Sequence, residues 1–131
     1  MNGFTSMYGV FEAELPLDRR MHEQLARAVL AWNTVEPLAP DDYAQVALLL
    51  TGAARAAACD VQRCAELLPD ADGKRLLAEL VLADADAELS WPLRGTLCCA
   101  QERARLVRGL YWRLDRLSET VVPAAAAPPT P

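Results

Sequence analysis

Hydrophobic positions recur at steps of three and four residues in four stretches of the chain, separated by proline and glycine. This spacing is that of one face of an α-helix, so the sequence predicts helices over about residues 18–33, 41–68, 73–90 and 93–117. Short connections favour antiparallel neighbours. We therefore predict an all-α fold, an antiparallel up-down-up-down four-helix bundle.

The last helical stretch has the widest hydrophobic arc. Its seam alternates steps of four and three from Leu93 to Leu114, and further leucines extend the arc over nearly half of the helix. A surface helix needs only a stripe, so this helix is expected to lie deep in the bundle or to supply an oligomer interface. The predicted interface residues here are Leu106, Leu110, Tyr111 and Leu117.

Both ends of the chain differ from the bundle, which is predicted to span residues 17–117. Residues 1–16 carry Phe4 and Phe11 without a helical period and are predicted to form an irregular apolar arm, which packs on its own domain or covers a partner. Phe4 and Phe11 are therefore added to the predicted interface. Residues 118–131 end in a proline- and alanine-rich segment, which favours a disordered tail.

Composition narrows the class of protein. Alanine and leucine together supply over a third of the residues, which favours helix, and 53% hydrophobic with 24% charged residues is typical of a soluble domain. The net charge of −5 opposes binding to nucleic acid or to an anionic membrane. We find no uninterrupted apolar run of membrane-spanning length and no secretory signal, so we expect a cytoplasmic protein.

The cysteines and the single histidine do not suggest a metal or a cofactor. Cys59 and Cys64 lie about 140° apart around one helix, and Cys98 and Cys99 about 100° apart, so they do not converge. His22 has no second histidine to complete a zinc or di-iron site, and we expect it to pack or to face solvent. Phosphate-cradling glycine loops and nucleophile-elbow motifs are absent from the sequence, so no metal and no cofactor are predicted.

Two charged residues interrupt hydrophobic faces. Asp84 lies about 40° from Leu80 on the third helix, and Arg103 about 40° from Val107 on the fourth, so both are predicted to point inward. One interpretation is an internal salt bridge that fixes helix register. The other is a polar centre in an apolar cavity, with Asp84 as general base or electrostatic anchor and Arg103 as a clamp for an anion. Asp86 is the second candidate for a role, although it, Glu79 and Glu88 also fit a solvated face.

Four segments of the chain carry a resemblance. They are MHEQLARAVLAW, the long helix ending in CAELLPD, LLAELVLADADAEL, and CAQERARLVRGLYWRLDRL. Together they resemble a family of small actinobacterial helical proteins of unknown function that is often associated with natural-product biosynthesis. The likeness covers about residues 17–117 and contains no catalytic motif, so it implies no particular site residue.

The resemblance implies a role in the biosynthesis of an antibiotic or another specialised metabolite. The chain resembles pathway-encoded accessory pairs such as those that form the aziridine of azinomycin. This likeness implies a subunit of a homo- or hetero-oligomer, and for an enzyme it implies one half of a two-protein enzyme that acts without a cofactor. Its partners would then be a protein or a second copy, and a biosynthetic intermediate. The alternative is a non-catalytic adaptor or regulatory protein-interaction module.

Overall fold

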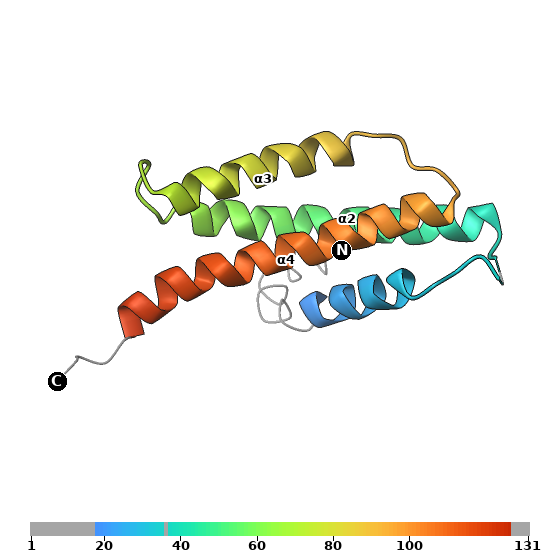
Figure 1. The fold of residues 1–131 in the computed structure, drawn as a ribbon, viewed down its shortest axis with the longest axis horizontal. Coiled ribbons are helices and arrows are strands. Elements are labelled where there is room, and N and C mark those ends of the chain that lie inside the picture. Colours follow the sequence, from blue (N-terminus) through green and yellow to red (C-terminus); the bar gives the residue numbers. More distant parts are fainter. Residues whose placement is uncertain (1–17, 36, 127–131) are drawn as a thin grey trace, which may run out of the picture.

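The computed structural model of the protein describes residues 18–35 and 37–126, with side chains as far as Glu119. Within this part of the chain there are four helices: residues 18–30, α2 (Pro40–Ala65), α3 (Gly73–Leu89) and α4 (Leu97–Ala126). The prediction of an all-α four-helix bundle is confirmed. Successive helices run in alternating directions along the long axis of the molecule (Figure 1).

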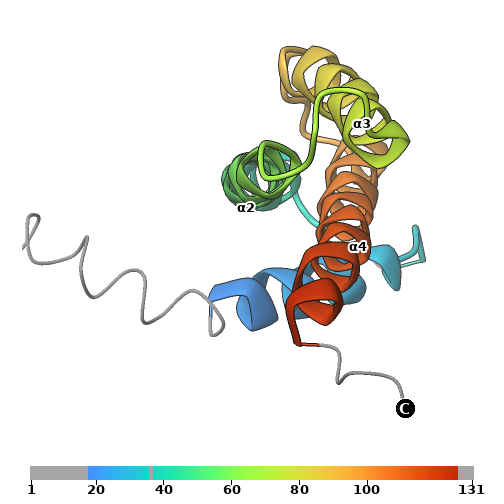
Figure 2. The same ribbon diagram turned by 90° about the vertical axis from the view of Figure 1, so that its left-hand side faces the viewer.

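α2 and α4 form the centre of the bundle, with residues 18–30 on one side of this pair and α3 on the other (Figures 1 and 2). Small side chains such as Ala54, Ala57 and Ala104 are fully buried and let the helices approach closely. The main core combines residues of all four helices: Ala26, Val29, Leu50, Ala53, Ala54, Ala57, Ala85, Leu89, Ala100, Ala104, Val107, Leu110 and Tyr111.

α2 corresponds to the second predicted helix, over about residues 41–68. Its buried positions include Tyr43, Leu50 and Val61, in step with the pattern read from the sequence. Among the described helices, α2 is also long and apolar enough to cross a membrane, with a hydropathy of 1.2 over its most apolar window. However, α2 contacts both α3 and α4, as the central helix of a bundle does. A central helix is as apolar as a membrane-spanning one, so its composition is explained by its place in the bundle.

The start of α4 differs from the prediction, which began this helix at about residue 93. Ser90 ends α3: its backbone N–H donates to the carbonyl of Asp86 at 3.1 Å and its hydroxyl donates to the same carbonyl at 2.9 Å. α4 begins only after Thr96, whose Oγ1 accepts from the backbone N–H of Cys99 at 3.1 Å. Residues 90–96 therefore form a connector, and Gly95 in it lies so close to Pro40 that a Cβ would stand 2.5 Å from the proline carbonyl oxygen.

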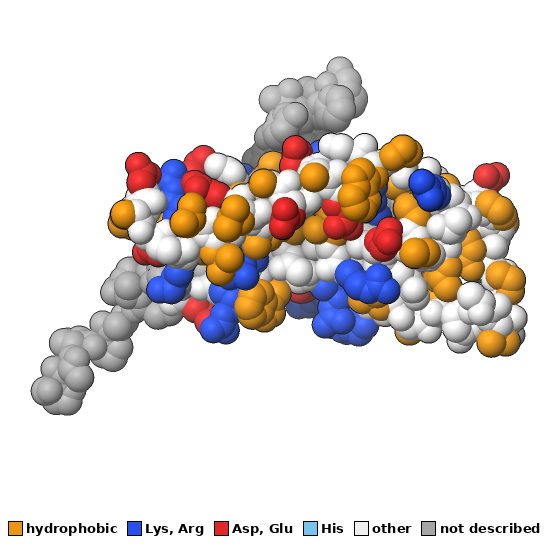
Figure 3. Space-filling view, turned by 45° about the horizontal axis from the view of Figure 1, so that its top comes forward, with side chains coloured by type: hydrophobic (Ala, Val, Ile, Leu, Met, Phe, Trp, Pro, Cys, Tyr) orange, Lys and Arg blue, Asp and Glu red, His pale blue; other side chains and the backbone are white. Residues whose placement is uncertain are grey.

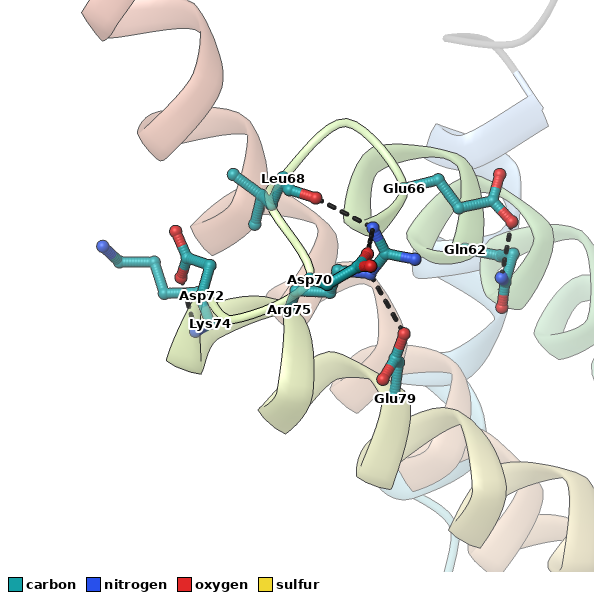
Figure 4. Close-up of polar contacts among 8 residues, drawn as sticks. All are labelled: Gln62, Glu66, Leu68, Asp70, Asp72, Lys74, Arg75 and Glu79. Carbon is teal, nitrogen blue, oxygen red and sulfur yellow. Dashed lines mark hydrogen bonds and ion pairs between the residues drawn. The ribbon is translucent and has the colours of Figure 1, made fainter.

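The turn between α2 and α3 is closed by Arg75 (Figure 4). Its guanidinium donates to the carbonyl of Leu68 at 2.9 Å and pairs with Asp70 at 2.9 Å and Glu79 at 3.1 Å. The hydrogen bond with Glu79 is the largest effect raising the pKa of Arg75 above its usual value. Asp72 caps α3 by accepting from the backbone N–H of Lys74 at 2.7 Å. The sequence predicted the turn but not this role of the arginine.

The predicted boundary of the tail at residue 118 differs from the structure, because α4 continues to Ala126. Pro123 removes one backbone donor and disfavours helix at this point, whereas the alanines that follow are the strongest helix formers. The predicted arm over residues 1–16, with Phe4 and Phe11, lies outside the described residues, as do residues 127–131.

The interface predicted on the last helix is not available to a partner. Leu110, Tyr111 and Leu117 are at most 3% exposed, and Leu106 is partly buried against the core. The bundle's own helices cover them, because α4 contacts residues 18–30 and α2 on adjoining sides. The wide hydrophobic arc thus reflects a central helix, the first of the two alternatives, and requires no second molecule.

The predicted inward face of the third helix is wrong. α3 buries Ala78, Ala85 and Leu89, whereas Leu76, Leu77 and Leu80 are 58%, 45% and 59% exposed. Both sides of this helix are apolar, and the inward side combines Ala78 and Ala85, which allow a neighbouring helix to approach closely, with Leu89, Val81 and Leu82. Leu76, Leu77 and Leu80 are left on the outside of the bundle.

Candidate ligand-binding site

A cavity of about 650 Å³ lies between the end of α3, the connector and the first turns of α4. This volume is in the range of small-molecule sites. We call it the arginine pocket, and it is lined by Glu88, Trp91, Pro92, Arg94, Thr96, Cys98, Cys99, Glu102 and Arg103.

Arg103 is the buried charged residue of the described chain and forms part of the pocket wall. It is 3% exposed. Its Nη2 donates to the carbonyl oxygen of Trp91 at 2.9 Å, whereas Nη1 is buried with no acceptor within hydrogen-bond distance among the described residues. A buried guanidinium with an unsatisfied donor destabilises the fold by several kcal/mol relative to a fully paired one. Nη1 is therefore a donor that an anion in the pocket could satisfy.

The pocket holds charges of both signs. Arg94 and Arg103 are balanced by Glu88 and Glu102. The pKa of Glu88 is raised, chiefly because burial disfavours its charged form, while Arg103 lowers it and Glu102 raises it. The site therefore offers a cationic group for an anion and, next to it, carboxylates for a cation.

The beginning of α4 adds a weaker attraction for anions. Thr96 caps this helix, and its first turn faces the pocket through Cys98 and Cys99. The positive end of the helix dipole thus lies in the same wall as Arg103. Cys99 is buried and its sulfur accepts from the backbone N–H of Arg94 at 3.4 Å, which ties the connector to the helix.

The predicted pairing of Asp84 with Arg103 is wrong. Asp84 is exposed on the outer side of α3, because that helix is rotated relative to the prediction. It lines a second, open groove of about 330 Å³ between α3 and α4, together with Arg105 and Trp112, and takes no part in the arginine pocket. Asp86 is exposed as well, and its carbonyl serves the end of α3. The structure does not bring either acid together with Arg103.

His22 belongs to a separate polar cluster between the first helix and α4. Its Nδ1 lies 3.0 Å from the hydroxyl of Tyr111, and Arg19 stacks over the tyrosine ring at 4.7 Å. Arg19 also pairs with Asp115 at 2.8 Å and Glu23 at 3.4 Å. Burial raises the pKa of Tyr111 to about 12, so its hydroxyl is protonated at neutral pH. Each of these groups has a partner, which marks the cluster as structural.

The sequence reasoning identified Arg103 but missed the residues around it. The sequence predicts Glu88 on a solvated face, and it gives Thr96 no role because the last helix is predicted to begin at about residue 93. Thr96 is the signal in the sequence that could have located the pocket. It is a good N-cap residue, and Cys99 and Arg103 follow it by three and seven residues, so they lie one and two turns further along the same side of the helix.

The thiols and acids of the described residues show no metal-binding arrangement. No three histidine, cysteine or acidic side chains among them are grouped so that they could hold a metal ion. Cys59 and Cys98 are exposed, Cys64 is partly buried and all four cysteines are free.

Comparisons with protein-family models, curated proteins and solved structures give no match to this chain.

Proposed function

We propose that this chain is a small-molecule-binding subunit that holds a ligand with both a carboxylate and an amino group in the arginine pocket. The observation that carries the proposal is Arg103, 3% exposed and with Nη1 unpartnered among the described residues, in the wall of a cavity of about 650 Å³. A carboxylate supplies the acceptor that this guanidinium lacks.

The amino group of the ligand is required by the acids of the pocket. Glu88 and Glu102 would repel a simple anion, whereas an ammonium group beside them turns this repulsion into attraction. The ammonium also favours the charged form of Glu88 and so returns its raised pKa toward the usual range. Trp91 and Pro92 supply an apolar surface for the rest of the ligand. An amino-acid-like molecule fits this combination.

The pathway context is the one that the sequence resemblance implies. In it, the ligand is an intermediate of a specialised metabolite, and the chain acts in the cytoplasm as one subunit of a complex. In a ring-forming reaction such as the closure of an aziridine, this chain would orient the intermediate and balance its charges, without metal or cofactor.

A non-catalytic adaptor is the second candidate, favoured by a different observation. The exposed leucines of α3 form a hydrophobic surface away from the pocket. Exposed patches of this kind mark protein-interaction sites.

The test is amide NMR titration of the full chain with L-phenylalanine as the probe and L-phenylalaninamide, which lacks the carboxylate, as the matched control. We expect L-phenylalanine to shift the backbone amide signals of Trp91 and of residues 93–99. L-phenylalaninamide should bind with at least about tenfold weaker affinity, the effect of losing one charged hydrogen bond. Arg103→Met should weaken binding by a similar factor. Equal binding of the two probes, or full affinity in Arg103→Met, would contradict the proposal.

The pH dependence of the same titration separates the role of the acids. Because the pKa of Glu88 is raised, this carboxylate loses its charge first as the pH falls, and the attraction for the ammonium group is lost with it. Affinity should therefore decrease on acidification in the native chain. Glu88→Gln should bind more weakly at neutral pH and lose most of this dependence, and an unchanged pH profile in that variant would exclude Glu88 from the site.

A further inference from the structure

The outer side of α3 is a continuous hydrophobic stripe. At about 100° per residue, its members fall within an arc of about 120°, the width that a helix usually buries against a neighbour. All are exposed, and one of them is charged. We call this surface the leucine stripe; it consists of Gly73, Leu76, Leu77, Leu80, Ala83, Asp84 and Ala87.

Side-chain size is distributed unevenly along the leucine stripe. Leu76 and Leu77 lie near the beginning of α3, Ala83 and Ala87 lie near its end, and Leu80 is in the middle. Two such helices placed antiparallel, with a twofold axis at Leu80, bring Leu77 of one level with Ala83 of the other, Gly73 level with Ala87, and Leu76 level with Asp84. Large residues against small ones allow the close interlocking that stable helix pairs require.

The charged residues of α3 are also distributed unevenly between its two ends. Lys74 lies at its beginning, whereas Asp84 and Asp86 lie toward its end, and the last turn holds no basic residue. Acids at this end oppose the dipole of their own helix. Next to an antiparallel copy they lie instead beside the positive beginning of the second α3. Figure 3 shows acidic side chains among the hydrophobic ones over α3, with the arginines of the neighbouring surface below them.

We propose that the leucine stripe binds a second copy of this chain, forming a twofold-symmetric dimer with the two α3 helices antiparallel. Symmetric self-association of this kind uses one patch that is complementary to itself, as this one is where Leu77 meets Ala83 of the second copy, with Lys74 at the edge of the patch near Asp84 of that copy. The 17-residue helix is about 26 Å long, so the interface is at the small end of specific dimers and reversible at micromolar concentrations. This inference is independent of the ligand proposed above.

Sedimentation equilibrium of the full chain tests the dimer. Leu80→Glu places two like charges together at the twofold axis and should weaken dimerisation by at least about tenfold. Met21→Glu, at a hydrophobic side chain of the first helix that is 60% exposed, is the matched control and should dimerise as the native chain does. Circular dichroism verifies that both variants fold. A native chain that stays monomeric up to hundreds of micromolar, or a dimeric Leu80→Glu, would overturn the proposal.

Disulfide trapping tests the orientation, in a Cys59→Ser, Cys98→Ser background that removes the exposed thiols. Leu80→Cys should form a covalent dimer on oxidation because the two sulfurs meet at the axis. Leu76→Cys should not, because its two copies are about 12 Å apart along antiparallel helices. Trapping at both positions would indicate a parallel pair, and trapping at neither would leave the stripe to residues 1–17 or to another protein. Each of these results refutes the antiparallel dimer.

Discussion

Arg19 of the first helix and Arg103 of α4 differ in how completely the fold pairs their guanidinium groups. Arg19 of the first helix, partly exposed, has two carboxylates and the ring of Tyr111 as partners near the end of the bundle. Arg103, much more deeply buried, has one carbonyl. Folding alone explains the first arrangement, since every group in it gains a partner. It does not explain the second, and the difference is the reason for placing a ligand at Arg103 and none at Arg19.

Gly95→Ala is expected to have the largest effect on stability. A Cβ at this position would stand 2.5 Å from the carbonyl oxygen of Pro40, and backbone cannot move away as a flexible side chain can. We expect a loss of about 2 kcal/mol in the free energy of unfolding, measured by urea denaturation. The shifted connector should also weaken binding in the arginine pocket, whereas the Arg19 cluster stays intact.

Gly109→Ala is the control for this substitution. Nothing lies within 4 Å of the position of its Cβ, and the residue is inside α4, where alanine favours helix by up to about 1 kcal/mol. This variant should be as stable as the native chain or more so. Equal stability of Gly95→Ala and the native chain would show that the connector is not held against α2.

Tyr111 makes the Arg19 cluster sensitive to alkaline pH. Its pKa is raised to about 12, so the folded chain retains a proton that the unfolded chain releases near pH 10. The contribution of this group to stability is therefore present below pH 10 and is lost as the pH rises toward 12, by about 2 kcal/mol. Denaturation at stepwise pH measures the loss. Tyr111→Phe should remove this component, and an identical slope in that variant would assign it to other groups.

Arg19→Met and Arg103→Met compare the two arginines directly. Removing Arg19 breaks ion pairs that are partly exposed and a cation–π contact, and should cost about 1 kcal/mol. Removing Arg103 replaces an incompletely paired buried charge with an apolar side chain of similar length, and should leave stability unchanged or higher. Thermal denaturation distinguishes the two. A strongly destabilised Arg103→Met would make Arg103 a structural residue like Arg19.

Sequence reasoning succeeded where one face of a helix was clearly the more hydrophobic. The buried side of α2 can be read from Tyr43 to Val61 because apolar residues recur there at every helical step, whereas Leu48 and Leu49 lie on an exposed side that is otherwise polar or small. Arg103 could be placed inside because hydrophobic residues surround it in every direction on α4. The pocket itself could not be predicted, because it is formed by a connector that was expected to belong to the helix.

The amino-acid sequence by itself determined the number of helices, their order and which sides of α2 and α4 are buried, because hydrophobic periodicity is a local property of the chain. Only the tertiary structure decided how α3 is turned. Its two sides are both apolar, and the side with Ala78, Ala85 and Leu89 packs inward, which leaves Leu80 and Asp84 outside and Arg103 without its predicted partner. The rotation of α3 about its axis depends on how its side chains pack against the neighbouring helix, and the hydrophobic periodicity of α3 carries no information about that packing.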